Sequence, residues 1–470
     1  MRQEHDLLGY RDVPDEAYYG IQTLRCTENF NITGVYLSDY PDFIKALAMV
    51  KQAAAQANYE LGLLEKETAE AIIAACKEII TGKLHDQFPA DMIQGGAGTS
   101  TNMNANEVIA NRALELLGHK KGEYQFCHPN NHINLAQSTN DAYPTAAKLG
   151  ICLSTEGLIA ELEALIASFR KKGQEFGGHI KMGRTQLQDA VPMTLGQEFE
   201  SYAASLEGEV AHIRHAASGL LEINMGATAI GTGINSDPAY ADLVTRRLAE
   251  ISGYPVKKAH NLIAATNDTT DFVSYSGQLK RLAVKISKIC NDLRLLASGP
   301  RAGLNEIRLP AMQPGSSIMP GKVNPVIPEV MNQVCFRVIG NDTAVMMACE
   351  AGQLELNVFE PVVIYSILES ISILKNGMAS LRERCIDGIK ANVEQCKVLT
   401  YRSIGLVTAL NPVLGYEVSS AIAKAALEEN RSVYDLVLER KLLSKEALDE
   451  ILKPENMTQP KKMQKMQPHR

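Results

Sequence analysis

Residues 141–175 read DAYPTAAKLGICLSTEGLIAELEALIASFRKKGQE, a stretch in which helix-forming residues dominate and apolar residues return at helical spacing. Further stretches rich in Ala, Leu, Glu and Lys predict helices of the same kind, at 42–61, 65–81, 104–117, 193–222, 268–297, 326–350 and 352–376. Helices longer than about 25 residues in a soluble protein bury their apolar stripes against one another, and often against other subunits. The sequence therefore predicts an all-α fold around a long helix bundle, and an oligomer.

The rest of the composition excludes several classes of protein. Strand patterns are short and few, so the βαβ rhythm of a nucleotide-binding fold is missing. The net charge of −7 argues against a nucleic-acid partner, which needs a broad basic face. No run of about 18 uncharged apolar residues occurs, which argues against a membrane span. Nine scattered cysteines without a C-x-x-C pair, and no secretory pattern after Met1, indicate reduced thiols and a cytoplasmic location.

Five segments rich in Gly, Asn, Thr and Ser precede or separate the long helices, at 95–106, 128–141, 183–192, 226–238 and 299–325. One such segment is ordinarily a turn with a helix cap, and the expected caps are Asn104 with Glu107, Asp141, and Asn324 before Pro325. Helix N-termini with free N–H groups and hydroxyls also bind carboxylates well. Five segments with this hydroxyl and amide content predict a distributed site for a small anion.

The last of these segments contains the loop GSSIMPGKVNP at 315–325, with two hydroxyls, a lysine and an amide between flexible glycines. A phosphate-binding P-loop has four residues between its glycines and a Ser or Thr after its Lys. This loop has five residues there, and Val323 follows the Lys. We therefore predict a mobile lid that closes over a small acid.

The loop 315–325 resembles the signature loop of the fumarase/aspartase superfamily. The resemblance covers essentially the whole chain, through the motifs YYG at 18–20, GTSTNMN at 98–104, QSTND at 137–141, GRTQLQD at 183–189 and ALNP at 409–412. It implies a three-domain helical subunit, which we expect to divide into 1–140, 141–395 and 396–470. It also implies a homotetramer with a twenty-helix core, in which each active site is built from three subunits.

Carried onto matching positions, the resemblance makes Ser316 the general base and places Lys322 and Asn324 at the α-carboxylate of the substrate. It surrounds the β-carboxylate with four hydroxyls, those of Thr99, Ser138, Thr139 and Ser317. It brings three further side chains near the amino group or the carboxylates, those of Asn140, Thr185 and Gln186. We expect no metal ligand and no required cofactor, and activation by a divalent cation such as Mg²⁺ is compatible with this pattern.

The reaction explains why so many donors are needed. Removing the weakly acidic Cβ proton of aspartate leaves an enediolate with two negative oxygens on the β-carboxylate. One well-placed oxyanion donor contributes about 2.7–4 kcal/mol, so several have to act together. A serine removes this proton only when it is held as an alkoxide, a form that loop amides and the Lys322 cation would favour.

Within the superfamily the closest similarity is to the aspartate ammonia-lyases, because Gln186 stands where fumarases carry a histidine. A fumarase has to expel hydroxide and needs an acid there, whereas the ammonium of aspartate leaves as neutral ammonia. The predicted activity is that of a carbon–nitrogen lyase, the reversible deamination of L-aspartate to fumarate. The alternative is a fumarate hydratase or another fumarate-releasing lyase. A non-enzymatic structural relative is disfavoured, because Ser316 and Lys322 are both present.

Several residues admit a second interpretation. His128 and His132 have the spacing of helical metal ligands, but the proline and asparagines between them disfavour a helix, and no third ligand is evident. Arg25 and Arg184 are equally compatible with a carboxylate contact and a structural ion pair. Glu329 pairs with the missing histidine in fumarases, and helix-start stabilisation is an equal interpretation here.

Overall fold

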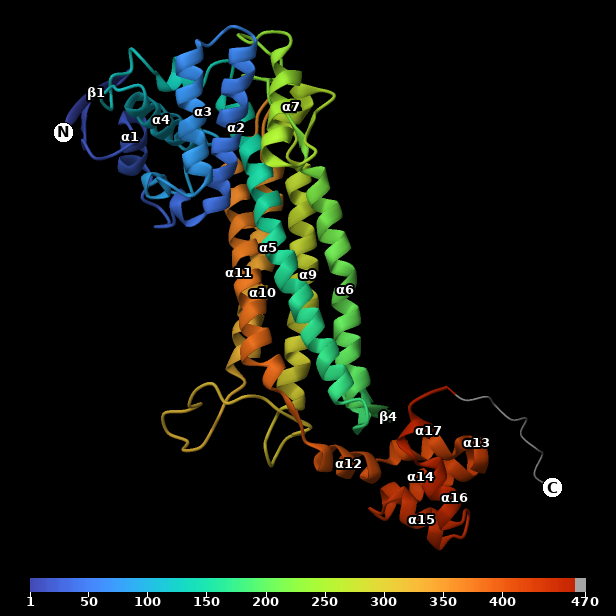
Figure 1. The fold of residues 1–470 in the computed structure, drawn as a ribbon. Coiled ribbons are helices and arrows are strands. Elements are labelled where there is room, and N and C mark those ends of the chain that lie inside the picture. The colour runs from blue at the N-terminus through green and yellow to red at the C-terminus, as the bar shows by residue number, and fades with distance from the viewer. Residues whose placement is uncertain (461–470) are drawn as a thin grey trace. The chain divides into compact units, whose positions relative to one another are not determined.

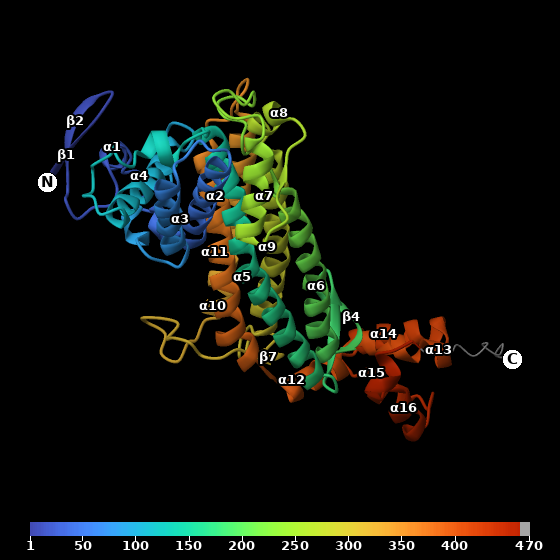
Figure 2. The ribbon, with the colours of Figure 1, turned by 45° about the horizontal axis from the view of Figure 1, so that its top comes forward.

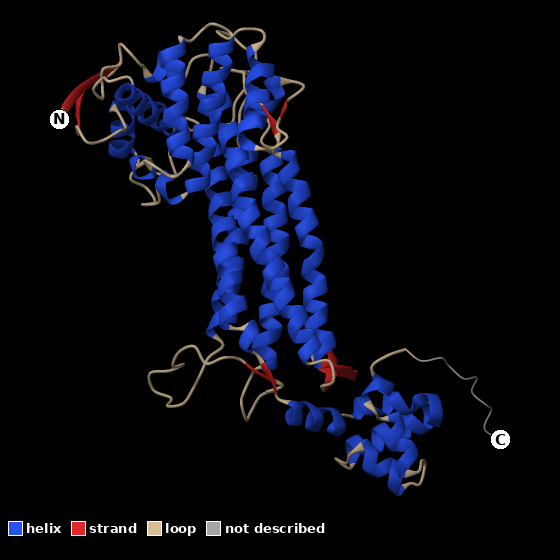
Figure 3. Ribbon diagram, viewed as in Figure 1, coloured by secondary structure: helices blue, strands red, loops and turns tan. Residues whose placement is uncertain are grey.

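The computed structural model describes residues 1–460, and the chain is mainly helical, as predicted (Figure 3). The helices are α1 Ile21–Asn29, α2 Pro41–Glu60, α3 Lys66–Ile80, α4 Thr99–Leu116, α5 Thr139–Glu175, α6 Leu195–Gly219, α7 Tyr240–Ser252, α8 Leu262–Asn267, α9 Thr270–Leu296, α10 Val326–Glu350, α11 Glu360–Arg384, α12 Val393–Arg402, α13 Asn411–Leu414, α14 Tyr416–Glu428, α15 Val433–Glu439, α16 Lys445–Ile451 and α17 Pro454–Met457. Strands of the described residues pair as β1 Arg2–Asp6 with β2 Gly9–Val13, β3 Ile180–Thr185 with β4 Gln188–Thr194, β5 Glu222–Ile223 with β6 Lys257–Lys258, and β7 Ile307–Arg308 with β8 Lys390–Ala391.

The long predicted helices are confirmed, and α10 has the predicted bounds, but α4 begins five residues before the predicted start at 104. Asn104 is therefore not a cap. It is fully buried inside α4, where its amide nitrogen donates to the Gln87 carbonyl oxygen at 2.9 Å. The preceding Gly98 has a φ of +87°, a left-handed conformation that glycine adopts readily, and the helix starts directly after it at Thr99.

The last predicted long helix, 352–376, is displaced, because α11 begins only at Glu360. Asn357 is fully buried, and its amide nitrogen donates to two carbonyl oxygens in the last turn of α10, at 3.0 and 3.1 Å. Its Oδ1 accepts from the Phe359 N–H at 2.8 Å, just before α11. One asparagine thus satisfies backbone groups at the end of one helix and before the next, so the intervening residues form a turn.

The chain forms two compact units, and α5, α6, α9, α10 and α11 contribute a segment to each. Unit 1 comprises Met1–Ala160, Glu209–Ala283 and Cys335–Lys375, and unit 2 comprises Glu161–Gly208, Val284–Val334 and the chain from Asn376 onward. Within each unit the five helix segments run side by side as the predicted bundle (Figures 1 and 2). The division into three domains at 140 and 395 stays a prediction.

In unit 1, α2 packs against α3 and α7 through a row of small side chains. Ala53, Ala54 and Ala57 are fully buried there, which lets the helix axes approach closely. Such apolar burial stabilises the fold by about 25 cal/mol per Å². The same helix contains Lys51, which is also fully buried, and this exception bears on the site described below.

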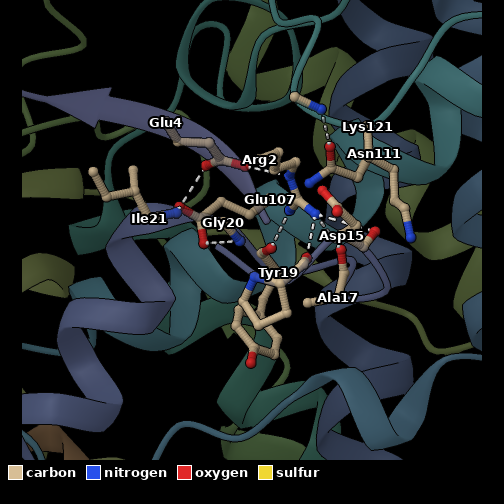
Figure 4. Close-up of polar contacts among 12 residues, drawn as sticks. Arg2, Glu4, Asp15, Ala17, Tyr19, Gly20, Ile21, Glu107, Asn111 and Lys121 are labelled. Carbon is tan, nitrogen blue, oxygen red and sulfur yellow. Dashed lines mark hydrogen bonds and ion pairs between the residues drawn. The ribbon is translucent and has the colours of Figure 1, made fainter. Parts of the chain in front are cut away.

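Two carboxylates fasten the N-terminal hairpin β1–β2 to α1 and α4 (Figure 4). Glu107 of α4 accepts hydrogen bonds from three backbone N–H groups at the start of α1 and from the Thr23 hydroxyl, at 2.6–3.1 Å. Glu4 of β1 accepts from the Ile21 N–H at 2.9 Å. A Cβ at Gly20 would lie 2.7 Å from a Glu4 carboxylate oxygen, so only glycine fits between the two carboxylates.

Replacing Glu107 by alanine is expected to lower the free energy of unfolding by about 3 kcal/mol or more, because three buried donors and one part-buried donor lose their acceptor. Thermal unfolding at a fixed protein concentration measures the loss. The matched control is Glu163→Ala, at an exposed position of α5, where a change within about 0.5 kcal/mol is expected. Equal melting temperatures for the two variants would contradict the role of Glu107.

Unit 2 carries the β3–β4 hairpin and the C-terminal helices. The pairing of the hairpin shifts between Met182 and Arg184, as in a β-bulge, which increases the local twist before the tip. The C-terminal helices enclose an apolar cluster of their own, in which Leu406, Leu410 and Val437 are fully buried.

Helix α11 with the turn after it, Glu360–Gly388, is the one described segment that is long and apolar enough to cross a membrane by length and composition. Half of its apolar window is buried inside the protein, and Leu368, Ile371 and Leu374 are at most 3% exposed. A core helix of a bundle has the same properties, and α11 packs as one.

Candidate functional site

Ser316 lies half-buried in the loop between β7 and α10 of unit 2. Its Oγ accepts hydrogen bonds from the backbone N–H groups of Ile318 at 3.2 Å and Met319 at 3.0 Å. A serine that closes a turn on its own backbone in this way is a common loop device. Because hydrogen bonds to an anion are stronger than those to a neutral oxygen, the two donors favour the alkoxide form of this serine.

The loop is closed at its base by two hydrogen bonds. The Gly315 N–H donates to the Lys322 carbonyl oxygen at 2.7 Å, and the Asn324 amide nitrogen donates to the Gly315 carbonyl oxygen at 2.8 Å. A Cβ at Gly315 would lie 2.6 Å from that Lys322 oxygen, so the close approach requires glycine. The side chains of Ser317 and Lys322 are exposed, and Lys322 forms no ion pair with any residue among 1–460. Its ammonium is therefore available to an anion.

The cap of α10 lies one residue after the predicted cap, Asn324. The Pro325 carbonyl oxygen accepts the first helical N–H, from Glu329 at 3.2 Å, so Pro325 holds the cap position instead of Asn324. The Asn324 side chain serves the loop base instead. Glu329 lies in the first turn of the helix, where a carboxylate interacts favourably with the helix dipole.

A second group of predicted residues lies at the start of α5 in unit 1. The cap is Ser138 and not the predicted Asp141: the Ser138 Oγ accepts from the Asn140 N–H at 3.1 Å, and Oδ1 of Asp141 accepts from the Ser138 N–H at 3.0 Å. This pair resembles a capping box, with an aspartate at the third helical position, but the serine hydroxyl accepts from the second helical N–H and not from the third. It leaves the Thr139 and Asn140 side chains in the first turn, half-exposed.

Asp141 ties this helix start to the glycine-rich loop after α6. Its Oδ2 accepts from the N–H groups of Gly226 at 3.1 Å and Thr228 at 2.9 Å. Full burial raises the pKa of Asp141 to about 6, and these N–H donors act against that rise. The Asn140 amide nitrogen donates to the Ala229 carbonyl oxygen at 2.6 Å. The segment 226–233 is therefore a turn that packs against the start of α5.

Thr99 begins α4 and is exposed, and its Oγ1 donates to the Gly96 carbonyl oxygen at 2.7 Å. The turn before it comes close to α5, because a Cβ at Gly98 would lie 2.5 Å from the Tyr143 ring. Gly98 and Tyr143 thus bring the start of α4 against the first turns of α5, which carry Thr139.

Thr185 and Gln186 lie exposed at the tip of the β3–β4 hairpin in unit 2. Gln186 and Leu187 have φ values of +55° and +61°, an uncommon conformation for residues other than glycine. Behind the tip, Arg184 forms an ion pair with the fully buried Glu306 at 2.8 Å. Arg184 is therefore a structural residue of the hairpin in this chain.

Arg25 has the same kind of role, because it pairs with Asp6 through two hydrogen bonds at 2.7 and 2.9 Å. The bidentate pair holds the pKa of the Asp6 carboxyl below its usual range. Arg25 and Arg184 thus both form structural ion pairs, one of the two interpretations that the sequence allowed for them.

Sequence reasoning missed one charged residue behind the α5 group, Lys51. Its ammonium donates to the side-chain oxygens of Asn102, Gln137 and Asn134, and the Asn102 amide nitrogen donates in turn to Oγ1 of Thr139 at 3.1 Å. Burial lowers the pKa of Lys51 to about 7, and the nearby Asp141 carboxylate acts in the opposite direction. The available signal was a lysine inside the apolar, alanine-rich stretch of α2.

His132 lies in a short π-helix, Pro129–Ile133, where the sequence disfavoured any helix, and His128 precedes it as the N-cap residue. The Nδ1 of His132 accepts from the His128 N–H at 2.8 Å, and the Nδ1 of His128 accepts from the Asn130 N–H at 3.0 Å. Burial lowers the pKa of both rings. Within residues 1–460 no three His, Cys, Asp or Glu side chains gather as metal ligands would.

The predicted site residues thus form three groups: Thr99 with the α5 start in unit 1, and the loop 315–324 and the hairpin tip in unit 2. No hydrogen bond among the described residues joins one group to another. Each group offers hydroxyl or amide donors, and the loop adds a cation. Hydroxyl and amide donors bind the carboxylates of a small dianion well, and the cation of the loop suits the same kind of ligand.

Comparisons with known proteins agree with this chemistry. A family model described as "Lyase" matches residues 9–340, and one described as "Fumarase C C-terminus" matches residues 406–459. The aspartate ammonia-lyase of Pseudomonas aeruginosa is 62% identical over 98% of this chain and 97% of its own length. That of Helicobacter pylori is 59% identical over 98% of both chains.

Among solved structures, one described as a fumarate lyase:delta crystallin from Brucella melitensis bound to cobalt has a TM-score of 0.95 and 56% identity. The match covers 98% of this chain and all of that one. The fold and the sequence therefore point to the same group of lyases.

Proposed function

The chain belongs to the aspartate ammonia-lyase family, whose reaction is the reversible deamination of L-aspartate to fumarate, and we propose that Ser316 is the base that removes the Cβ proton. The observation that carries this proposal is the pair of loop N–H groups on the Ser316 Oγ, at 3.0 and 3.2 Å. Both donors belong to the loop itself, and they supply the stabilisation that an alkoxide needs. Lys322, six residues on in the same loop, supplies the cation.

The α5 start is the proposed site of the β-carboxylate. The helix N-terminus carries partial positive charge and exposes backbone N–H groups, both of which favour a bound anion. The hydroxyls of Ser138 and Thr139 lie in this turn, and Thr99 and Ser317 complete the set. As the proton leaves, the β-carboxylate becomes an enediolate with two negative oxygens, so each of these donors interacts more strongly with the transition state than with aspartate.

Lys322 and Asn324 are the proposed partners of the α-carboxylate. The Lys322 ammonium is exposed and has no carboxylate partner among residues 1–460. One N–H of the Asn324 amide is used at the loop base, and an amide carries two, so the second is left for the substrate. Closure of the loop over a bound acid would bring these groups and Ser316 to it together.

Gln186, Thr185 and Asn140 are the proposed contacts near the amino group. A neutral amide suffices at position 186, because the ammonium of aspartate leaves as ammonia without an added acid. A fumarate hydratase would need an acid at this point to expel hydroxide. The relatives' names agree with this distinction, and the hydratase alternative is not favoured.

A homotetramer with shared active sites is the proposed assembly. Exposed apolar side chains on α10 support it, with Val330, Phe336, Met346 and Met347 between 44% and 63% exposed. A long helix with such side chains gains stability by packing against another subunit. Helices of neighbouring subunits would then bring donor groups from different chains to one substrate.

The proposed enzyme is cytoplasmic and needs no cofactor, nucleic acid or membrane. Eight of the nine cysteines are buried and they are scattered through the helical core, which fits reduced thiols in a reducing compartment. The described side chains do not form a three-ligand metal group, so no step of the reaction is assigned to a metal. Rates measured with EDTA and then with added Mg²⁺ test whether a divalent cation activates the enzyme.

The activity is tested by following fumarate absorbance with L-aspartate and, separately, with L-malate. We expect fumarate from aspartate at a rate at least 100-fold above that from malate. Fumarate from malate alone would identify a hydratase and contradict the proposal. Fumarate from neither would point to a lyase with a larger substrate or to a non-enzymatic relative.

A further inference from the structure

Lys51 is a fully buried lysine whose ammonium forms no ion pair with any residue among 1–460. Its Nζ donates to Oδ1 of Asn102 at 2.7 Å, to Oε1 of Gln137 at 2.8 Å and to Oδ1 of Asn134 at 3.0 Å. An ammonium has three N–H donors, so each is used. Three neutral amide dipoles hold the charge, and no carboxylate touches it.

Packing does not explain a charge at this position. Removing an ammonium from water costs several kcal/mol, and an apolar side chain of similar length would fill the same space without that penalty. The other three lysines buried within residues 1–460 have direct counter-ions: Lys148 lies 3.1 Å from Asp271, Lys172 lies 2.8 Å from Glu175, and Lys181 lies 3.1 Å from Glu306. Lys51 is different, because its ammonium contacts three amide oxygens and no carboxylate. One of these amides, that of Asn102, also contacts Thr139 at the start of α5.

Asn102 is the link between Lys51 and the proposed site. Because an ammonium can only donate hydrogen bonds, the Asn102 atom that contacts Lys51 is the amide oxygen, Oδ1. The amide nitrogen of Asn102 therefore points toward Thr139. That nitrogen donates to Oγ1 of Thr139 at 3.1 Å. A threonine hydroxyl that already accepts one hydrogen bond has its own proton left to donate, and polarisation along the chain strengthens that donation.

We propose that Lys51 is a positioning residue for proton removal, which through Asn102 holds Thr139 as a hydrogen-bond donor to the β-carboxylate. This inference rests on the proposed function, because it takes Thr139 as a substrate contact. The β-carboxylate gains negative charge as the enediolate forms. A donor backed by a buried cation therefore stabilises the transition state more than bound aspartate, and its loss lowers kcat more than it raises KM.

The first test replaces Lys51 by methionine, which keeps the length of the side chain and removes its charge and donors. We expect kcat for aspartate to fall about 10- to 100-fold, while KM changes less than about threefold. The matched control is Lys148→Met, a second buried lysine of unit 1 that pairs with Asp271. It should lower the melting temperature and leave kcat unchanged. Lys51→Met with unchanged kcat, or with a rise in KM alone, would overturn the proposal.

The second test is a double-mutant cycle with Thr139→Val. If Lys51 acts through Thr139, Lys51→Met lowers kcat by less than about twofold when Thr139 is already valine. Losses that multiply would overturn the Lys51 inference and leave the proposed role of Thr139 intact. An unchanged kcat in Thr139→Val itself would instead remove Thr139 from the proposed function.

A third variant keeps the inference testable if Lys51→Met does not fold. Asn102→Leu retains side-chain volume and the lysine, but removes the amide between Lys51 and Thr139. We expect the same 10- to 100-fold loss of kcat, again without further loss when combined with Thr139→Val. Full activity in a folded Asn102→Leu enzyme would overturn the proposal.

Discussion

Replacing Ser316 by alanine is expected to lower kcat by about 10²- to 10⁴-fold, the usual contribution of a positioned acid or base. The variant loses the Ser316 Oγ, which accepts hydrogen bonds from the Ile318 and Met319 N–H groups, and with it the proposed alkoxide. Folding should be unaffected, because the loop backbone is closed at Gly315 by bonds that do not involve this side chain. Steady-state kinetics and size-exclusion chromatography measure the two effects.

The neighbouring serine provides a control for the Ser316 variant. Ser317 is exposed, and its proposed role is to donate one hydrogen bond to the β-carboxylate. Ser317→Ala should therefore reduce activity less than Ser316→Ala. A Ser316→Ala enzyme with near-normal kcat would remove this serine from the base role, whatever the Ser317 result.

Lys322→Met is expected to raise KM for aspartate about 10- to 100-fold, because hydrogen bonds to charged groups contribute about 1.5–3 kcal/mol each. The melting temperature should not change, since the ammonium has no ion-pair partner within residues 1–460. Initial rates over a wide range of aspartate concentration separate KM from kcat.

A surface lysine far from the loop in sequence serves as the comparison for Lys322. Lys424 lies on α14 and forms a solvent-exposed pair with Glu428 at 3.8 Å, which contributes little. Lys424→Met should leave KM and kcat unchanged. Identical kinetic constants in the Lys322 and Lys424 variants would contradict the assignment of Lys322 to the α-carboxylate.

The helix bundle was predictable because long amphipathic helices depend mainly on local pattern. The bounds of α10 followed from the helical stretch after Pro325, and the end of α5 from the helical spacing of its apolar residues, although α5 starts two residues before the predicted 141. The displaced start of α11 did not follow, since it depends on buried Asn357 satisfying backbone groups at the ends of two helices. Such a contact has no periodic signal in the sequence.

The candidate site was predictable at the level of motifs and less so at the level of single atoms. The pattern Ser138-Thr-Asn-Asp141 predicted the start of a helix, but Ser138 and Asp141 are both residues that commonly cap one. The hydrogen bonds of the structure show that Ser138 is the cap. The burial of Lys51 was not predicted, because a lysine in a helix is normally exposed and the alanine-rich stretch around it is a weak signal. Only its three amide contacts show that it faces inward.

The hydrogen-bonded base of the loop 315–325 has a consequence for how tightly the enzyme can hold its substrate. Fixing the backbone of one residue costs about 1–2 kcal/mol in conformational entropy, so an unstructured lid of this length would have to lose about 10 kcal/mol or more on closing. Here the Gly315 and Asn324 bonds and the Ser316 turn are made between atoms of the loop itself and involve no ligand atom. The loop can thus close as a pre-formed piece, and most of the binding free energy remains for the substrate.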